Sequence, residues 1–168
     1  MRHPASADGV AGIVARIERA PGILKVGYAL EGDLDGLLIP VSGRVRRGDK
    51  LWQHTCFEIF ISARMPAYHE FNFSPSGEWA AYAFGRYREA IQDLAVDAPS
   101  VSALKGAGGL KLNAIIPLRD NARFSVALSA VVESKSGALS YWALKHPPGK
   151  PDFHHPDSFS LKLDEVRN

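Results

Sequence analysis

Apolar and polar side chains alternate with a period of two along most of this 168-residue chain. In residues 24–30 every second side chain is apolar, and the same alternation recurs in residues 110–116 and 124–133. This period predicts strands with one buried face, because successive side chains of a strand point to opposite sides. Turn-forming residues separate the segments at intervals of roughly 8–12 residues, which is typical of an all-β antiparallel sandwich or barrel. The expected strands are residues 10–16, 24–30, 37–41, 55–62, 69–75, 78–85, 101–104, 110–116, 124–133, 139–145 and 159–163.

Three of the early segments are less regular. The apolar residues of segment 10–16 also have helical spacing, so a short helix is an alternative there. Pro40 removes a backbone donor, which places segment 37–41 at a sheet edge. Residues 42–54 contain two glycines and no sustained period, and they predict a long loop. Long loops are uncommon in compact domains unless they serve a function.

The composition indicates one domain, residues 9–168, after a disordered lead-in of residues 1–8. The single cysteine, Cys56, lies in an apolar run and is expected to be a buried thiol. The 20 basic and 18 acidic residues are scattered and give a net charge of +2, so we expect no nucleic-acid surface. No apolar segment approaches the roughly 20 residues of a membrane span, and residues 9–20 are too charged for a signal sequence. We therefore expect a cytoplasmic protein without membrane contact.

The stretch from Trp52 to Arg88 holds the densest aromatic content of the chain. Ser76 and Gly77 predict a two-residue hairpin loop in its centre. Counting outward from this loop places every large apolar side chain except Trp79 on one face, and we interpret that face as the core. The predicted cross-strand pairs are Ser74 with Trp79, Phe73 with Ala80, Asn72 with Ala81, Phe71 with Tyr82, Glu70 with Ala83 and His69 with Phe84.

The opposite face of this hairpin is predicted to be polar. Glu70 and Asn72 point to it above small alanine side chains, with Trp79 at the edge, and the adjacent strand adds Glu58. A carboxylate in the middle of a strand needs a partner or water, because burial of an unpaired charge is costly. The face is therefore either a shallow polar binding site or a solvated surface with paired carboxylates. The basic residues expected within reach are Arg86, Arg88 and Lys145.

Three blocks of the sequence resemble the DOMON-like proteins related to carbohydrate-binding module family 9, and in particular a bacterial subgroup of them. The blocks are WQHTCFEIFI at 52–61, YHEFNFSPSGEWAAYAFGRYR at 68–88 and YWALKHPPGKPDFHHPDSF at 141–159, about a third of the chain. The resemblance implies a single immunoglobulin-like, jelly-roll-like β-sandwich that binds a sugar or, in some relatives, haem.

The same resemblance implies which residues would contact a sugar. Aromatic rings would flank the apolar C–H face of a pyranose, while carboxylate, amide and guanidinium groups would bond its hydroxyls. His146 shares a predicted strand face with Trp142, so it would line the site or pack against the proline-rich loop that follows it. The candidates are Trp52, Trp79 and Trp142 as platforms and Glu58, Glu70, Asn72 and Arg86 as hydroxyl partners.

We interpret the chain as a non-catalytic ligand-binding module, with a protein-interaction or structural sandwich as the alternative. Glu58 and Glu70 lie on neighbouring predicted strands, which permits the roughly 5–9.5 Å separation of a glycosidase pair. An open sheet face, however, lacks the enclosed cleft that raises one carboxyl pKa. No catalytic residue is therefore expected.

The histidines, carboxylates and methionines of the chain raise the alternatives of metal and haem binding. His146, Asp152, His154 and His155 match no zinc-binding spacing, so loop histidines that cap backbone groups are expected instead. The oxygens of the predicted polar face could hold calcium as a structural ion. A haem with methionine and histidine ligands is not expected, because Met65 lies beside a turn proline and the other methionine, Met1, lies in the lead-in.

Overall fold

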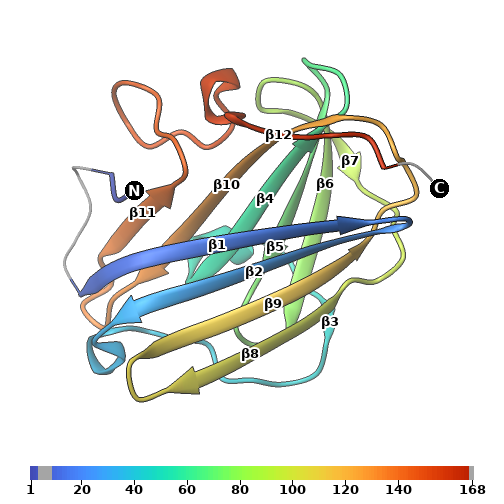
Figure 1. Cartoon of the computed structure of the whole chain (residues 1–168). Coiled ribbons are helices and arrows are strands. Elements are labelled where there is room, and N and C mark those ends of the chain that lie inside the picture. The colour runs from blue at the N-terminus through green and yellow to red at the C-terminus, as the bar shows by residue number, and fades with distance from the viewer. Residues whose placement is uncertain (4–8, 167–168) are drawn as a thin grey trace.

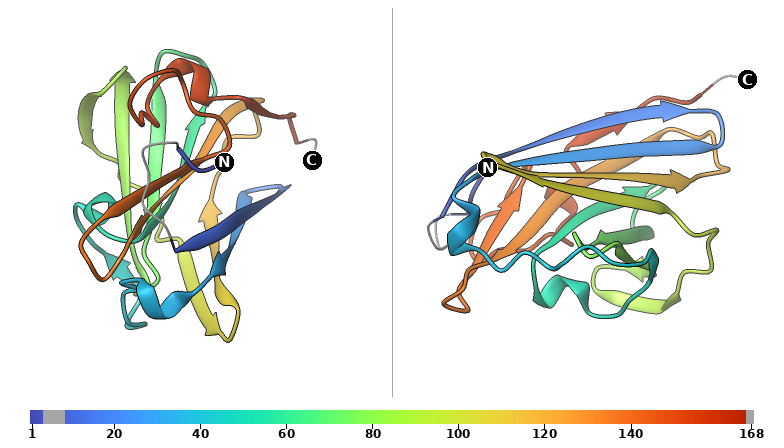
Figure 2. Two further views of the ribbon diagram at one scale, coloured as in Figure 1. Left: turned by 90° about the vertical axis from the view of Figure 1, so that its left-hand side faces the viewer. Right: turned by 90° about the horizontal axis from the view of Figure 1, so that it is seen from below.

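Two β-sheets stack face to face in the computed structural model, which describes residues 1–3 and 9–166 (Figures 1 and 2). Their strands cross obliquely in the view of Figure 1. The smaller sheet has the order β1 (Val10–Ala20), β2 (Ile23–Gly32), β9 (Gly109–Pro117) and β8 (Ser100–Gly106). The larger sheet has the order β11 (Leu139–Ala143), β10 (Phe124–Glu133), β4 (Cys56–Ser62), β5 (Tyr68–Phe73), β6 (Glu78–Arg86) and β3 (Arg46–Arg47), with β12 (Leu161–Leu163) paired to β10 and β7 (Glu89–Asp93) paired to β6.

The core lies between the two sheets and follows from the alternation in the sequence. Leu24, Val26, Tyr28 and Leu30 of β2 are buried, and they face the apolar side of the larger sheet. Tyr28 also reaches across the core, where its hydroxyl donates a hydrogen bond of 2.7 Å to the backbone carbonyl of Glu58. The predicted all-β sandwich is therefore confirmed.

Most expected strands are present. Residues 10–16 belong to the expected strand, β1, and not to the alternative helix. There are three local differences. Residues 37–41 form no strand, and only Leu37 makes an isolated bridge. The predicted loop 42–54 contains β3 and the 3-10 helix η2 (Leu51–Gln53), and β7 was not predicted. The other 3-10 helices are η1 (Leu34–Gly36) and η3 (Pro156–Ser158).

The amino-terminal residues were predicted to be disordered. Met1 and His3 instead form backbone hydrogen bonds with β11, and His3 is buried. Residues 4–8 lie outside the described part of the chain, so the prediction for them stays untested. Within the described residues, no helix has the length and apolar character needed to cross a membrane.

The hairpin between β5 and β6 has a different register from the predicted one. The amide of Ser74 donates to the carbonyl of Glu78, and the amide of Gly77 donates to the carbonyl of Ser74, so the loop has three residues. Gly77 has a φ of 92°, as expected for glycine at the end of such a loop, and the preceding Pro75 favours the turn. The extra loop residue shifts β6 by one position, so Phe73 pairs with Trp79.

This shift reverses the predicted faces of β6. Trp79 and Ala81 point into the core, whereas Tyr82 and Phe84 lie on the outer face of the larger sheet. The alanine floor predicted from Ala81 and Ala83 is therefore wrong, and Ala80 lies opposite Asn72 instead. The predicted faces of β4 and β5 are confirmed, because Phe57, Ile59, Ile61, Phe71 and Phe73 all belong to the core.

The β8–β9 hairpin contains a glycine that a side chain could not replace. A Cβ at Gly109 would overlap the backbone carbonyl oxygen of Leu30, so Gly109→Ala requires the backbone of β2 or β9 to move. We expect a loss of about 2 kcal/mol or more in the free energy of unfolding, measured by urea denaturation. Gly106→Ala is the matched control, because nothing lies within 4 Å of its Cβ position. Equal stability of the two variants would contradict this packing.

Candidate functional site

The outer face of the larger sheet, turned away from the smaller sheet, carries polar side chains from three strands. Glu58 of β4 lies directly opposite Ser129 of β10 on one side and Asn72 of β5 on the other. Glu70 precedes Asn72 by two residues, so it points to the same face, where it pairs with Tyr82 of β6. Glu58, Glu70, Asn72 and Ser129 therefore gather at one place, which we call the outer-face cluster.

Two short hydrogen bonds organise the outer-face cluster. The hydroxyl of Ser129 donates to Oε2 of Glu58 at 2.8 Å, and Nδ2 of Asn72 donates to Oε1 of Glu70 at 2.8 Å. Because the amide nitrogen of Asn72 is committed to Glu70, its oxygen points elsewhere. This Oδ1 is buried and has no hydrogen-bond partner among the described residues. A buried acceptor without a partner is unusual in a folded protein.

The two carboxyl groups are almost completely buried, with Glu58 2% and Glu70 4% exposed. Burial and, to a lesser extent, the charge of Glu70 raise the pKa of Glu58 to about 8, while the Ser129 hydrogen bond opposes the shift. Burial likewise raises the pKa of Glu70 to about 7, against the opposing effects of Asn72 and Arg88. Both groups therefore hold protons at a pH where exposed glutamates are ionised.

An exposed tryptophan borders the outer-face cluster on one side. Helix η2 places Trp52 edge-on to Tyr82, with 5.6 Å between the ring centroids, and Trp52 is 40% exposed. Tyr82 donates a hydrogen bond to Asp49 at 3.1 Å, which fixes its ring beside Glu70. Below η2, Leu51 packs with Cys56, Ala80 and Tyr82 on the same sheet face. The indole of Trp52 is thus presented to solvent next to the carboxyl groups.

An imidazole borders the cluster on the other side. The ring of His154 packs against Phe60 and Phe84 at 5.1 Å, and its Nε2 lies 3.8 Å from Oε2 of Glu70. The hydroxyl of Tyr68 accepts a hydrogen bond from the amide of Arg88 and bonds Nδ1 of His154 at 2.8 Å.

His154 does not provide a positive charge to the cluster at neutral pH. Burial and, to a lesser extent, the charge of Arg88 lower the pKa of His154 to about 4. Arg88 is held by Asp152 at 3.0 Å, and Asp152 also accepts a hydrogen bond from Tyr87. Arg88 and Asp152 thereby join the turn after β6 to the loop that carries His154. The predicted pairing of the glutamates with Arg86, Arg88 or Lys145 does not occur.

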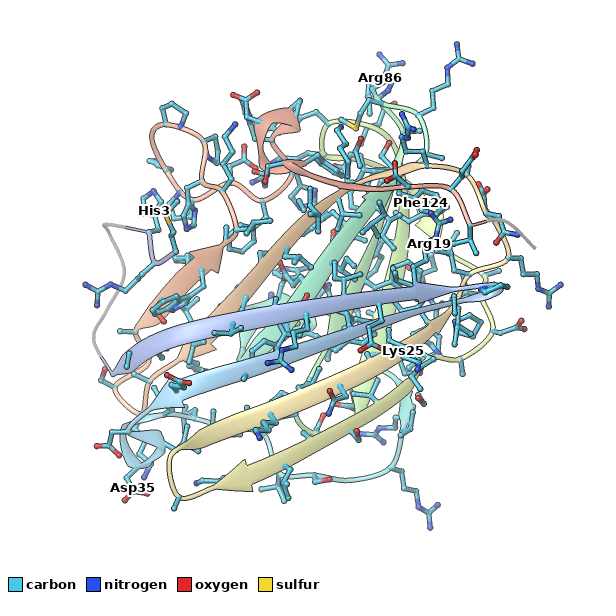
Figure 3. The ribbon with its side chains drawn as sticks, in the orientation of Figure 1. His3, Arg19, Lys25, Asp35, Arg86 and Phe124 are labelled. Atoms are coloured by element: carbon cyan, nitrogen blue, oxygen red, sulfur yellow. The ribbon has the colours of Figure 1, made fainter. Side chains whose placement is uncertain are left out.

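The structure brings together four of the eight predicted site residues: Trp52, Glu58, Glu70 and Asn72. Trp79 and Trp142 instead belong to the core between the sheets, because the alternation of β6 and β11 turns both inward. Arg86 points away from the molecule and pairs with Glu89 at 2.7 Å (Figure 3).

His146 does not share a strand face with Trp142, because β11 ends at Ala143. Its Nε2 bonds the carbonyl of Met1 at 3.0 Å, and its ring lies 5.0 Å from that of His3. The side chain therefore belongs to the contact between the amino-terminal residues and the loop after β11, away from the outer-face cluster.

Sequence reasoning missed Ser129, Tyr82 and His154 as neighbours of the carboxyl groups. Ser129 occupies an outward-facing position in the alternating pattern of β10, so the sequence pattern could have identified it. Tyr82 was assigned to the wrong face by the register error. His154 was expected to cap backbone groups, as His155 does by accepting a hydrogen bond from the amide of Asp157. Its approach to Glu70 depends on the fold of a loop distant in sequence.

Two hollows lie at the open sides between the sheets. One, of about 260 Å³, is lined mainly by apolar residues of β1, β10 and β11, including Trp142, and also by Ser129 of the outer-face cluster. The other, of about 930 Å³, lies beside Arg47, Asp93 and the β9–β10 turn. Neither hollow is lined by Glu58, Glu70 or Asn72. Among the described residues, the outer-face cluster combines an exposed aromatic ring, that of Trp52, with a buried polar atom that lacks a partner, Oδ1 of Asn72.

The described residues contain no group of three or more histidine, cysteine, aspartate or glutamate side chains arranged to hold a metal ion. The outer-face cluster offers two carboxyl groups and one amide oxygen, fewer oxygen ligands than the six to eight that calcium takes. Its arrangement is better suited to a group that brings hydrogen-bond donors.

No protein-family model and no curated protein matches the chain in sequence. Solved structures match its fold. A protein of Bacteroides uniformis, proposed to bind carbohydrate, superposes with a TM-score of 0.64 at 14% identity, over 87% of this chain and 75% of that one. A family 9 carbohydrate-binding module of Caldicellulosiruptor kristjanssonii in complex with cellotriose gives 0.57 at 10% identity, over 84% and 72%. A glucose complex of a family 9 module from the same organism gives 0.53 at 12%, over 86% and 72%.

Proposed function

We propose that this protein is a non-catalytic carbohydrate-binding module whose site is the outer-face cluster and the adjacent Trp52. The observation that carries the proposal is the buried, unpartnered Oδ1 of Asn72 between two carboxyl groups, beside a tryptophan that is 40% exposed. An aromatic ring next to converging polar groups suits a pyranose, which has one apolar face and a rim of hydroxyls. The fold shared with carbohydrate-binding modules supports the same class of ligand.

Each residue has a distinct role in this proposal. Trp52 stacks on the C–H face of the sugar ring, and Tyr82 holds the indole from below. Asn72 accepts a hydrogen bond from the sugar through its free Oδ1, and the carboxyl groups of Glu58 and Glu70 form hydrogen bonds with the sugar hydroxyls. Desolvation makes these bonds strong, because water is already excluded from the acceptors.

Glycoside hydrolysis is a second candidate, because the carboxyl groups are enclosed and not on an open face as predicted. The pKa values of about 8 and about 7 leave one protonated and one ionised carboxyl group at a pH between them. A retaining or inverting glycosidase needs such a pair. Binding without turnover is the better account because the structurally similar proteins are carbohydrate-binding modules. Release of aryl alcohol from chromogenic glycosides, abolished by Glu58→Gln, would favour the enzyme instead.

The binding proposal is tested by isothermal titration calorimetry with glucose and cellotriose, the ligands of the structurally similar modules. We expect Trp52→Ala to weaken binding about tenfold or more, because it removes the stacking platform. Leu104→Ala is the control, since Leu104 is an exposed apolar residue of the smaller sheet. Unchanged affinity of the Trp52 variant would show that the saccharide binds at another place on the protein. If no saccharide binds, the alternative that remains is a protein-interaction or structural module.

A further inference from the structure

The hydroxyl and amide donors of the outer-face cluster are used internally. Ser129 donates to Glu58, and Asn72 donates to Glu70. Three oxygens then remain for a ligand: Oε1 of Glu58, Oε2 of Glu70 and Oδ1 of Asn72. Since Glu58 and Asn72 are directly opposite in register, and Glu70 is bonded to Asn72, these oxygens are close neighbours. When both carboxyl groups are ionised, all three are acceptors, and a ligand group at this point must bring several donors.

The described surroundings of the two carboxyl groups hold no cation in contact with them. The imidazole of His154 approaches Glu70 to 3.8 Å, but burial lowers its pKa to about 4, so it is neutral at pH 7. Arg88 is paired with Asp152, and the hydroxyl of Tyr82 donates to Asp49. The other titratable groups facing the pair are the buried thiol of Cys56 and the hydroxyl of Tyr68.

We propose that the outer-face cluster binds a ligand ammonium group, so that the preferred carbohydrates are amino sugars with a free amine. This inference rests on the proposed function, because it names the class of sugar bound at the same site. An ammonium has three donors and no acceptor, which matches three free acceptor oxygens. It also brings the positive charge that two buried carboxyl groups lack.

Other sugar substituents match these three oxygens less well. A hydroxyl or an N-acetyl group donates only one hydrogen bond and brings no charge, so it meets the cluster with the protons of Glu58 and Glu70 still in place. A free amine brings three donors and a positive charge. With it both carboxyl groups can ionise, and all three oxygens accept a hydrogen bond.

Binding of an ammonium is expected to release protons from the cluster. In the free protein, Glu58 and Glu70 hold protons near pH 7, because burial raises both pKa values. A positive charge beside them favours the ionised carboxylates and lowers these pKa values. A neutral sugar brings no charge and leaves the protons in place. Proton release thus separates an amine bound at the cluster from an amine bound elsewhere.

The experiment compares glucosamine, N-acetylglucosamine and glucose, which differ only at C2, by titration calorimetry at pH 7 in two buffers of different ionisation enthalpy. We expect glucosamine to bind at least tenfold more tightly than the other two, with proton release. Glu70→Gln keeps the shape of the side chain and is expected to abolish both the preference and the release. Trp52→Ala is expected to weaken the binding of glucosamine and the binding of glucose by the same factor.

The outcomes separate this inference from the function on which it rests. Equal or tighter binding of glucose would overturn the amine preference and leave carbohydrate binding intact. A preference for glucosamine that persists in Glu70→Gln, or that occurs without proton release, would place the amine outside the cluster and overturn the inference. Absence of binding by all three sugars, with cellotriose also inactive, would overturn both proposals.

Discussion

Replacement of Glu58 by glutamine is expected to stabilise the protein at alkaline pH. The folded protein holds the proton of Glu58 up to a pKa of about 8, whereas an unfolded glutamate has an ordinary value of 4.5. Between these values the folded state binds more protons than the unfolded state, so the free energy of unfolding falls as pH rises. Glu58→Gln lacks this loss and is expected to exceed the wild type by roughly 3–5 kcal/mol at pH 9. At pH 5 we expect the two proteins to be nearly equal.

Urea denaturation at pH 5, 6, 7, 8 and 9 measures this difference. The buried histidines contribute equally to both proteins, because the substitution leaves them in place, so their titration cancels. Glu18→Gln is the control, since the side chain of Glu18 is 77% exposed and pairs only weakly with Lys25 at 3.8 Å. A pH profile of Glu58→Gln parallel to that of the wild type would show that Glu58 is ionised in the folded protein, contrary to its burial.

Local periodicity was sufficient to predict the strands that form the core. In β2 the alternation of Leu24, Val26, Tyr28 and Leu30 indicates which face is buried, and no residue distant in the sequence is needed to predict it. The faces of β4 and β5 followed in the same way. The side chains of Glu58 and Asn72 were thus assigned to one face from the pleat alone, and the structure confirms it.

The face of β6 could not be obtained from periodicity, because its register depends on the length of one loop. A loop of two residues and a loop of three residues differ by one position, and one position exchanges the two faces of a strand. Pro75 and Gly77 are the local signal for the longer loop, since proline favours the first corner of a type I turn and glycine the left-handed residue after it.

The burial of the carboxyl groups depends on segments far away in the sequence. Leu51 of η2 covers one end of the outer face, and Phe159 and His154 cover the other. A single strand pattern predicts which side of a sheet a residue occupies, but not whether a loop will cover that side. For this reason Glu70 was predicted either in a shallow polar site or at a solvated surface, and it is found 4% exposed.

The two tryptophans of the central region are expected to respond in opposite ways to removal. Trp79 is 5% exposed, packs in the core between the sheets and has the guanidinium of Arg47 4.7 Å above its ring. Trp79→Ala leaves a large cavity and should lower the free energy of unfolding by about 3–5 kcal/mol. Trp52 lies on the outer face and is 40% exposed, so Trp52→Ala should cost about 1 kcal/mol or less.

Urea denaturation of the two variants, followed by saccharide titration of each folded protein, separates the two roles. With the register found in the structure, Trp79→Ala loses stability and keeps its affinity under conditions where it is folded, while Trp52→Ala keeps stability and loses affinity. The register predicted from a two-residue loop places Trp79 on the outer face and requires the reverse for that residue. A stable Trp79→Ala protein with weakened saccharide binding would therefore contradict the pairing of Phe73 with Trp79 and, with it, the placement of Tyr82 beside Glu70.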